Sequence, residues 1–182
     1  HKLYGPSGIG VLYGKQSLLD TMPPYQSGGD MIEKVSFSGT SYNELPYKFE
    51  AGTPNMVGAD GLAAAIDYVS AIGLTQIIEH ETDILQYATE KALAIPGLRI
   101  IGTAEHKAGI LSFVINGVHS TDIGTLLDQQ GVAIRVGHHC TMPLMERFGL
   151  NSTARFSFGI YNSHKDIDLA FAALEEALKI LN

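Results

Sequence analysis

Cys140 is the first residue whose side chain could take part in a reaction. It is the single cysteine among 182 residues. It closes the segment Arg135-Val136-Gly137-His138-His139-Cys140. Cationic and imidazole neighbours favour the thiolate, the nucleophilic form of cysteine. Two other interpretations stay open. A lone cysteine is often buried and inert, and His-His-Cys could ligate a metal, although adjacent residues seldom aim at one ion.

Lys2 is the second candidate. It lies between His1 and a turn-rich segment, Gly-Pro-Ser-Gly-Ile-Gly, that starts at Gly5. We expect this lysine to be partly shielded, a setting that suits an amine that must form an imine. A solvated surface lysine is the alternative, because most lysines are exposed.

Arg155 and Thr53 point to anion binding. Arg155 lies in the apolar segment 154–158, where an unpaired guanidinium would be costly to bury. Its planar donors match a carboxylate, supplied by a substrate or by an Asp or Glu of this chain. Thr53 belongs to Gly-Thr-Pro-Asn, just before a predicted helix, where a hydroxyl and backbone N–H groups can bind phosphate. The alternative is that Gly-Thr-Pro-Asn is an ordinary turn that binds no phosphate.

Periodicity predicts the elements that position these residues. The apolar run 9–14 predicts a buried strand, and residues 20–58 predict a long irregular region. Helices are expected from 59 to near 73, from 77 until Pro96-Gly97, from a Ser120 cap until Gly131, and over 143–148. Strands are expected at 98–101, 110–115, 132–136 and 154–158. Ser163 and Asp166 predict a capping box that starts a final helix.

Composition narrows the class of protein. The formal charge of −7 disfavours nucleic-acid binding, and no apolar run approaches the ~20 residues of a membrane helix. One cysteine suits a reducing compartment. We predict three parts: the tail of a larger domain at 1–58, a connecting helix at 59–73, and a small α+β domain at 74–182. Because the chain begins in mid-motif without Met, we expect the C-terminal part of a longer protein.

Three motifs together carry a family resemblance. His-Lys-Leu-Tyr-Gly-Pro-Ser-Gly-Ile-Gly at the start, Phe-Glu-Ala-Gly-Thr-Pro-Asn from Phe49, and Arg-Val-Gly-His-His-Cys from Arg135 resemble the SufS/CsdB-type (group II) cysteine desulfurases. These are pyridoxal 5'-phosphate (PLP) enzymes of the class-V aminotransferase family. The resemblance spans the whole chain. It implies an α/β fold of the aspartate-aminotransferase-like type I, represented here by the tail of the large domain and the small C-terminal domain.

The resemblance also implies roles for individual residues. Lys2 is similar to the lysine that holds PLP as a Schiff base, and His1 and Thr53 to residues that contact the cofactor phosphate. In the same family Thr53 would reach the site of the neighbouring subunit of a homodimer.

A second set of residues is assigned to the substrate. Cys140 resembles the nucleophile that becomes a persulfide, and Arg155 the clamp for the substrate carboxylate. Arg135 and His139 are expected to flank the substrate. Thr141 departs from the alanine that is more usual after the cysteine, which could alter the mobility of this loop.

The implied activity converts L-cysteine to L-alanine and passes sulfur to a SufE-type acceptor for iron–sulfur cluster assembly in the cytoplasm, with L-selenocysteine as a second substrate and no metal. Because much of the family's cofactor site lies upstream of the lysine, we expect this segment alone to bind PLP poorly and to be inactive. Three other hypotheses stay open: a related transaminase or epimerase with a structural Cys140, a non-catalytic packing module, and a metal-binding module.

Overall fold

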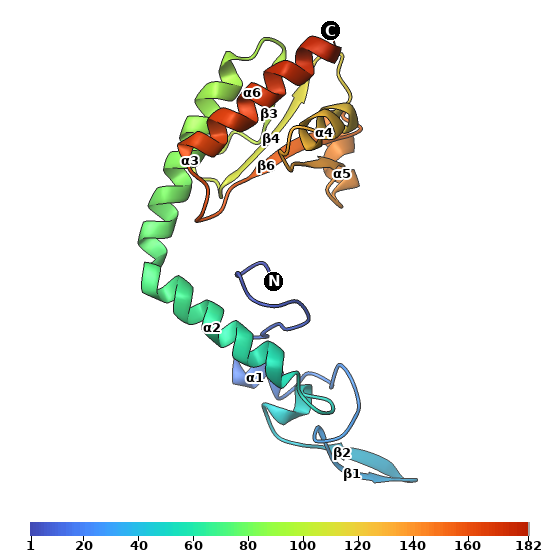
Figure 1. Cartoon of the computed structure of the whole chain (residues 1–182). Coiled ribbons are helices and arrows are strands. Elements are labelled where there is room, and N and C mark those ends of the chain that lie inside the picture. Colours follow the sequence, from blue (N-terminus) through green and yellow to red (C-terminus); the bar gives the residue numbers. More distant parts are fainter. Residues whose placement is uncertain (182) are drawn as a thin grey trace. The chain divides into compact units, whose positions relative to one another are not determined.

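The computed structural model describes residues 1–181 and divides into two compact units, His1–Ile72 and the segment that begins at Gly73 (Figure 1). Among the described residues, no single helix is long and apolar enough to cross a membrane, and only the consecutive helices Met56–Ile72 and Leu74–Ala94 meet the length and composition requirement jointly.

The first unit contains a hairpin and one long helix. Its elements are α1 (Gln16–Leu19), β1 (Ile32–Ser36), β2 (Gly39–Tyr42), the 3-10 turn η1 (Tyr47–Phe49) and α2 (Met56–Ile72). Strands β1 and β2 pair antiparallel, and Met31, just before β1, is fully buried.

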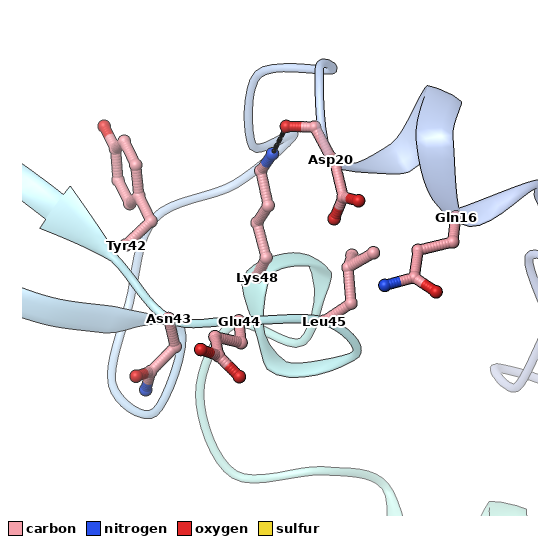
Figure 2. A pocket seen from close by; sticks show the side chains of 7 residues that line it. All are labelled: Gln16, Asp20, Tyr42, Asn43, Glu44, Leu45 and Lys48. Carbon is pink, nitrogen blue, oxygen red and sulfur yellow. Dashed lines mark hydrogen bonds between the residues drawn. The ribbon is translucent and has the colours of Figure 1, made fainter.

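Lys48 ties two of these elements together. Its Nζ donates to the carbonyl oxygens of Leu19 at 3.1 Å and Asp20 at 2.9 Å, where α1 ends. Figure 2 shows this lysine in a polar cavity of about 560 Å³ together with Tyr42 and Glu44. The contact satisfies carbonyl groups that a helix end leaves without intrahelical partners.

Two predictions for this unit are wrong. Residues 9–14 form no strand, and Val11, Leu12 and Tyr13 are 80%, 69% and 90% exposed. A strand requires a partner strand for its backbone groups, and none within residues 1–72 pairs with this run. The region 20–58 is not irregular throughout, because it contains the β1–β2 hairpin.

The second unit packs helices on a four-stranded antiparallel sheet. The strand order is β3 (Leu98–Ile101), β4 (Ile110–Ile115), β6 (Thr153–Ser157) and β5 (Arg135–Gly137). Helices α3 (Leu74–Ala94), α4 (Ser120–Asp128) and α6 (His164–Leu181) supply the rest of the core, and α5 (Met142–Phe148) follows β5 (Figure 1). Most of the elements expected from periodicity are therefore confirmed.

Two details of this unit differ from expectation. The strand predicted at 132–136 forms only at Arg135–Gly137, because the sheet pairs these three residues with β6. Helix α4 begins at Ser120, but its cap is His119, whose Nδ1 accepts the Thr121 N–H at 3.3 Å. The Ser120 hydroxyl instead donates to Ser152 at 2.7 Å.

The capping box of α6 is confirmed. The Ser163 N–H donates to the Asp166 carboxylate at 2.8 Å, and the Asp166 N–H donates back to the Ser163 hydroxyl at 3.4 Å. The apolar face that follows is buried, with Leu174 and Ala177 at 0% exposure. The helix therefore starts where its two local hydrogen bonds direct it and is held by its apolar face.

Three aromatic residues pack together in the core between the sheet and α6. Phe113 of β4 is fully buried and stacks on Phe156 of β6 with ring centroids 5.5 Å apart. Phe171 of α6 meets Phe156 at 5.6 Å. Burial of each ring contributes about 1.5–3 kcal/mol, so this cluster fixes β6, the strand that carries Arg155.

Polar contacts on the surface join α3 to α6. Asp168 accepts from Lys91 Nζ at 2.7 Å and from the Tyr87 hydroxyl at 2.8 Å. His164 stacks on Tyr87 at 4.4 Å and lies 2.8 Å from an Asp83 oxygen. The hydrogen bonds from Lys91 and Tyr87 lower the pKa of Asp168, and the hydrogen bond to Asp168 raises the pKa of Lys91.

Asp168→Asn should lower the melting temperature at pH 7, because it removes the charge that joins α3 to α6. Because the pKa of Asp168 is lowered, its carboxylate contributes to the free energy of unfolding at pH values above its ordinary pKa, 3.8. That contribution is lost as pH falls through the lowered pKa. Because the pKa of Lys91 is raised, the stabilisation from its ion pair with Asp168 persists up to the ordinary pKa of lysine, 10.5. It is lost as pH rises further, through the raised pKa. Thermal unfolding across pH measures both limits.

Glu176→Gln is the matched control, because it removes a carboxylate from an exposed pair with Lys179 within α6 alone. Its effect should be smaller, as expected for a surface pair inside one helix. Equal effects of the two variants at pH 7 would contradict a role of Asp168 in joining the helices.

Candidate functional site

Strand β6 places Arg155 at the centre of the candidate site. Its neighbours Ala154 and Phe156 are buried in the core, and because side chains alternate along a strand, Arg155 projects to the opposite face. Across the ladder, Arg155 pairs with Arg135 of β5. Two like charges opposite each other on a sheet repel, so this face attracts anions.

The segment after β5 forms an unusual turn. His139 and Cys140 both have left-handed backbone conformations, with φ of 54° and 62°. Each such residue that is not glycine costs about 1–3 kcal/mol. Hydrogen bonds offset this cost: the Cys140 N–H donates to His138 Nδ1 at 3.2 Å, and the Thr141 N–H donates to the His138 carbonyl at 2.8 Å.

The turn presents the sulfur of Cys140 at the surface. Cys140 is exposed, so the expectation of a buried cysteine does not hold among the described residues. One N–H of the Arg135 guanidinium donates to Sγ at 3.7 Å. A donor and a positive charge beside sulfur support its anionic, nucleophilic form.

Arg155 has no acidic partner among residues 1–181. No N–H of its guanidinium makes a hydrogen bond there, and its Nε is buried without a partner. The alternative of a salt bridge to an Asp or Glu of this chain therefore does not hold for the described residues. A half-buried guanidinium with free donors is suited to bind a carboxylate from outside the chain.

His139 is anchored to the start of β6. Its Nε2 lies 2.8 Å from the Thr153 hydroxyl and 3.2 Å from the Thr153 carbonyl oxygen. Burial lowers the pKa of His139 most; the Thr153 carbonyl opposes this, and the electrostatic effects of Arg155, Arg135 and His138 lower it further. The ring is therefore neutral near pH 7. Because a carbonyl only accepts, we assign the single proton to Nε2, which leaves the buried Nδ1 without a partner.

Thr153 is a site residue that the sequence reasoning missed. It is 1% exposed, one of few buried polar residues among those described. The only available signal was its position two residues before Arg155, which places both on one face of a strand.

A largely apolar cavity of about 400 Å³ adjoins these residues. The polar residues that line it are Ser112, His139, Thr141, Thr153 and Arg155. Its apolar wall is formed by Ile101, Ile110, Leu144, Met145 and Phe148. The cavity is thus suited to a small molecule with an apolar body and an anionic group.

The remaining candidates lie in the first unit. His1, Lys2 and Thr53 are all exposed. The expectation that Lys2 is partly shielded is wrong within residues 1–72, because Lys2 is exposed there and its amine makes no hydrogen bond or ion pair in that unit.

Asn55 connects the segment of Lys2 with the segment of Thr53. Its Nδ2 donates to the Gly8 carbonyl at 3.2 Å, and its Oδ1 accepts the Gly58 N–H at 2.9 Å in the first turn of α2. The same side chain therefore caps a helix and holds the N-terminal loop. Among residues 1–181, no group of three or more His, Cys, Asp or Glu residues is placed to hold a metal ion.

Comparison with known proteins identifies the family. Residues 1–170 match the aminotransferase class-V family. The chain belongs to this family. It is 50% identical over 181 residues to a probable cysteine desulfurase of Xylella fastidiosa, covering 100% of this chain and 44% of that protein. It is 49% identical over 182 residues to a cysteine desulfurase of Serratia proteamaculans, covering 100% of this chain and 45% of that protein.

Solved structures agree with this class-V assignment. The cysteine desulfurase CsdA of Escherichia coli superposes with a TM-score of 0.95 at 40% identity, over 100% of this chain and 45% of CsdA. The cystine C-S lyase C-DES superposes at 0.77 with 19% identity, over 94% of this chain and 43% of C-DES, and shows the fold alone. The resemblance to cysteine desulfurases and the mixed α/β fold are confirmed. The chain spans less than half the length of these relatives.

Arg135→Gln should slow the alkylation of Cys140 by iodoacetamide about three-fold, the size of one exposed charge interaction. Iodoacetamide is neutral, so a change in the alkylation rate reports the reactivity of the Cys140 sulfur and not electrostatic attraction of the reagent. Mass spectrometry of the Cys140 peptide over time measures the rate. Arg99→Gln is the control, because Arg99 is an exposed arginine on β3; equal slowing by both variants would contradict a local effect of Arg135.

Proposed function

We propose that the protein containing this chain is a PLP-dependent cysteine desulfurase that acts on L-cysteine. One observation carries the proposal: an exposed thiol, Cys140, lies beside Arg135 of the edge strand β5, and the adjacent strand β6 carries Arg155, an arginine without an acidic partner among the described residues. A nucleophilic sulfur next to a carboxylate-binding group fits an amino acid whose side chain ends in sulfur. The names of the relatives support the same reaction.

The first unit offers groups that fit PLP. Lys2 supplies an exposed primary amine, which can bind an aldehyde. Thr53 supplies a hydroxyl beside Gly52, where even an added Cβ would meet no atom within 4 Å. We propose that Lys2 holds the cofactor and that His1 and Thr53 contact its phosphate. When bound, PLP supplies an electron sink for the substrate α-carbon.

The residues of this chain then have distinct tasks. Arg155 holds the substrate carboxylate through two parallel hydrogen bonds, which orients the substrate. Lys2 Nζ takes the proton from the α-carbon. The Cys140 thiolate attacks the substrate sulfur, so that an S–S bond forms as the Cβ–S bond breaks. The electron pair of that bond stays on Cβ, which takes up the proton of the substrate thiol. Lys2 Nζ returns the proton to the α-carbon, which gives L-alanine, and Cys140 is left as a persulfide.

Further assignments complete the proposal. Arg135 and His139 flank the substrate, with Arg135 next to the attacking sulfur. Exposure of Cys140 supports transfer of its sulfur to an acceptor protein of the SufE type, for iron–sulfur cluster assembly in the cytoplasm. L-Selenocysteine, which differs by one atom, is a second substrate, and the enzyme is a homodimer.

The division into parts also remains a proposal. Residues 1–58 form the tail of the PLP-binding domain, 59–73 a connecting helix, and 74–182 the small domain. The 182 residues alone are inactive, because they span less than half the length of the cysteine desulfurases they match and so hold only part of the cofactor site. Sustained release of alanine from this segment with added PLP and L-cysteine would contradict that statement.

Arg155→Lys should lower kcat/KM for L-cysteine in the complete enzyme about ten-fold or more, mainly through KM. Lysine keeps the charge but loses the planar pair of donors, and charged hydrogen bonds of this kind contribute about 1.5–3 kcal/mol. Steady-state alanine release measures both constants. Arg99→Lys, on the exposed side of β3, should leave them unchanged; an unaltered KM in Arg155→Lys would remove Arg155 from substrate binding.

Lys2→Ala and Cys140→Ser should separate the two halves of the chemistry. Lys2→Ala should lose the visible absorbance of the cofactor held by the lysine, whereas Cys140→Ser should keep that absorbance and form no persulfide. Absorbance spectra and mass spectrometry of the Cys140 peptide measure these outcomes. Lys15→Ala, an exposed lysine of the same unit, is the control. Activity near wild type in Cys140→Ser would favour a transaminase or epimerase with a structural cysteine.

A further inference from the structure

We propose that Thr153 is a positioning residue for Cys140, acting through its hydrogen bond to His139. The inference deepens the proposed function and rests on it for the identity of the nucleophile. It goes further because it names the residue that sets where the sulfur lies relative to the arginine that receives the carboxylate.

The first step is the connection between the turn and the sheet. The hydrogen bonds made by His138 close the turn on itself. His139 instead reaches out of the turn, to the hydroxyl of Thr153 at 2.8 Å and its carbonyl oxygen at 3.2 Å. The imidazole of His139 is therefore a side-chain link between the Cys140 turn and strand β6.

The second step concerns the strand that receives this link. Thr153 is buried and Ala154 is fully buried, so this end of β6 is held by the core. Thr153 and Arg155 are two residues apart and share one face of the strand. One strand thus holds both the turn that carries the nucleophile and the guanidinium that awaits a carboxylate. The spacing between the two groups is set by the backbone of β6.

The third step concerns the backbone of the turn. His139 and Cys140 are adjacent, and both are left-handed. Such a pair persists only where the surroundings hold it. If the Thr153 hydroxyl is removed, the ring of His139 keeps only the longer contact with the carbonyl. The two residues can then relax toward ordinary backbone conformations, which moves Sγ away from the Arg135 guanidinium.

The charges around His139 agree with this role. Arg135, Arg155 and His138 all lie close enough to disfavour a positive ring, and the buried Nδ1 has no acceptor for a second proton among the described residues. A neutral ring that donates from Nε2 to Thr153 avoids a further positive charge between two arginines. The cavity wall formed by His139, Thr153 and Arg155 stays available for an anionic ligand.

The test compares Thr153→Val, which keeps the shape but removes the hydroxyl, with Thr153→Ser, which keeps the hydroxyl. In the complete enzyme, Thr153→Val should slow alkylation of Cys140 by iodoacetamide about five-fold, the size of one lost hydrogen bond. It should lower kcat for alanine release by a similar factor and leave KM for L-cysteine near wild type, since Arg155 is untouched. Thr153→Ser should restore both rates.

Ser120→Ala is the matched control. It removes another buried hydroxyl of the same unit, which donates to Ser152 at 2.7 Å and makes no hydrogen bond to the Cys140 turn. Its alkylation rate and kcat should equal those of wild type, whatever its effect on the melting temperature. Slowing by Ser120→Ala to the same extent would show that any lost buried hydroxyl suffices, and would overturn the proposal.

His139→Asn provides a second route if Thr153→Val does not fold. His139→Asn should slow alkylation as much as Thr153→Val, and the double variant should slow it no further, because both changes break one link. Additive effects, an unchanged rate in either folded single variant, or failure of Thr153→Ser to restore the rates would overturn the positioning role. If wild type releases no alanine but alkylation still follows this pattern, the proposed function fails while the positioning role stands.

Discussion

Antiparallel pairing of β5 with β6 is the constraint on which the candidate site depends. It sets Arg135 directly opposite Arg155, although like charges facing each other across a sheet are unfavourable. No carboxylate among residues 1–181 neutralises Arg155. Arg135 is instead directed to the sulfur of Cys140. The sheet edge therefore keeps a local excess of positive charge, in a chain whose formal charge is −7.

The core supplies the stability that this arrangement requires. Phe113, Phe156 and Phe171 stack in the core, and Phe156 adjoins Arg155 in sequence on the opposite face of β6. Strand β6 is central to the sheet, with β4 on one side and β5 on the other. A strand with two partners and a buried aromatic face is rigid, so the repulsion between the arginines and the strained turn can be tolerated without loss of the fold.

The exposed position of Cys140 also follows from the turn. A left-handed backbone at two successive residues turns the chain sharply after β5, and α5 begins two residues later at Met142. The sulfur lies on this turn rather than under α5. The proposed function, in which the thiol meets both a small substrate and an acceptor protein, requires such access, whereas a thiol inside the core would meet neither.

The sequence by itself determined the features that arise from neighbours along the chain. Helical periodicity and the capping box located α6, apolar runs located β3 and β4, and three short motifs indicated the family. Those signals are local, because side-chain periods and caps involve residues a few positions apart. The motifs also identified Lys2 and Cys140 as candidates, and the single charge in the apolar segment 154–158 identified Arg155, without any knowledge of contacts.

Only the tertiary structure decided which distant residues meet. The pairing of Arg135 with Arg155, the contact of His139 with Thr153, and the lack of an acidic partner for Arg155 among residues 1–181 are set by strand register. The run 9–14 shows the same limit, since it has the composition of a strand but no partner strand within its unit. Strand pairing depends on residues far apart in sequence, and Thr153 is buried beside residues of the segment 139–148, which precede it by several positions. No pattern read along the chain contains that information.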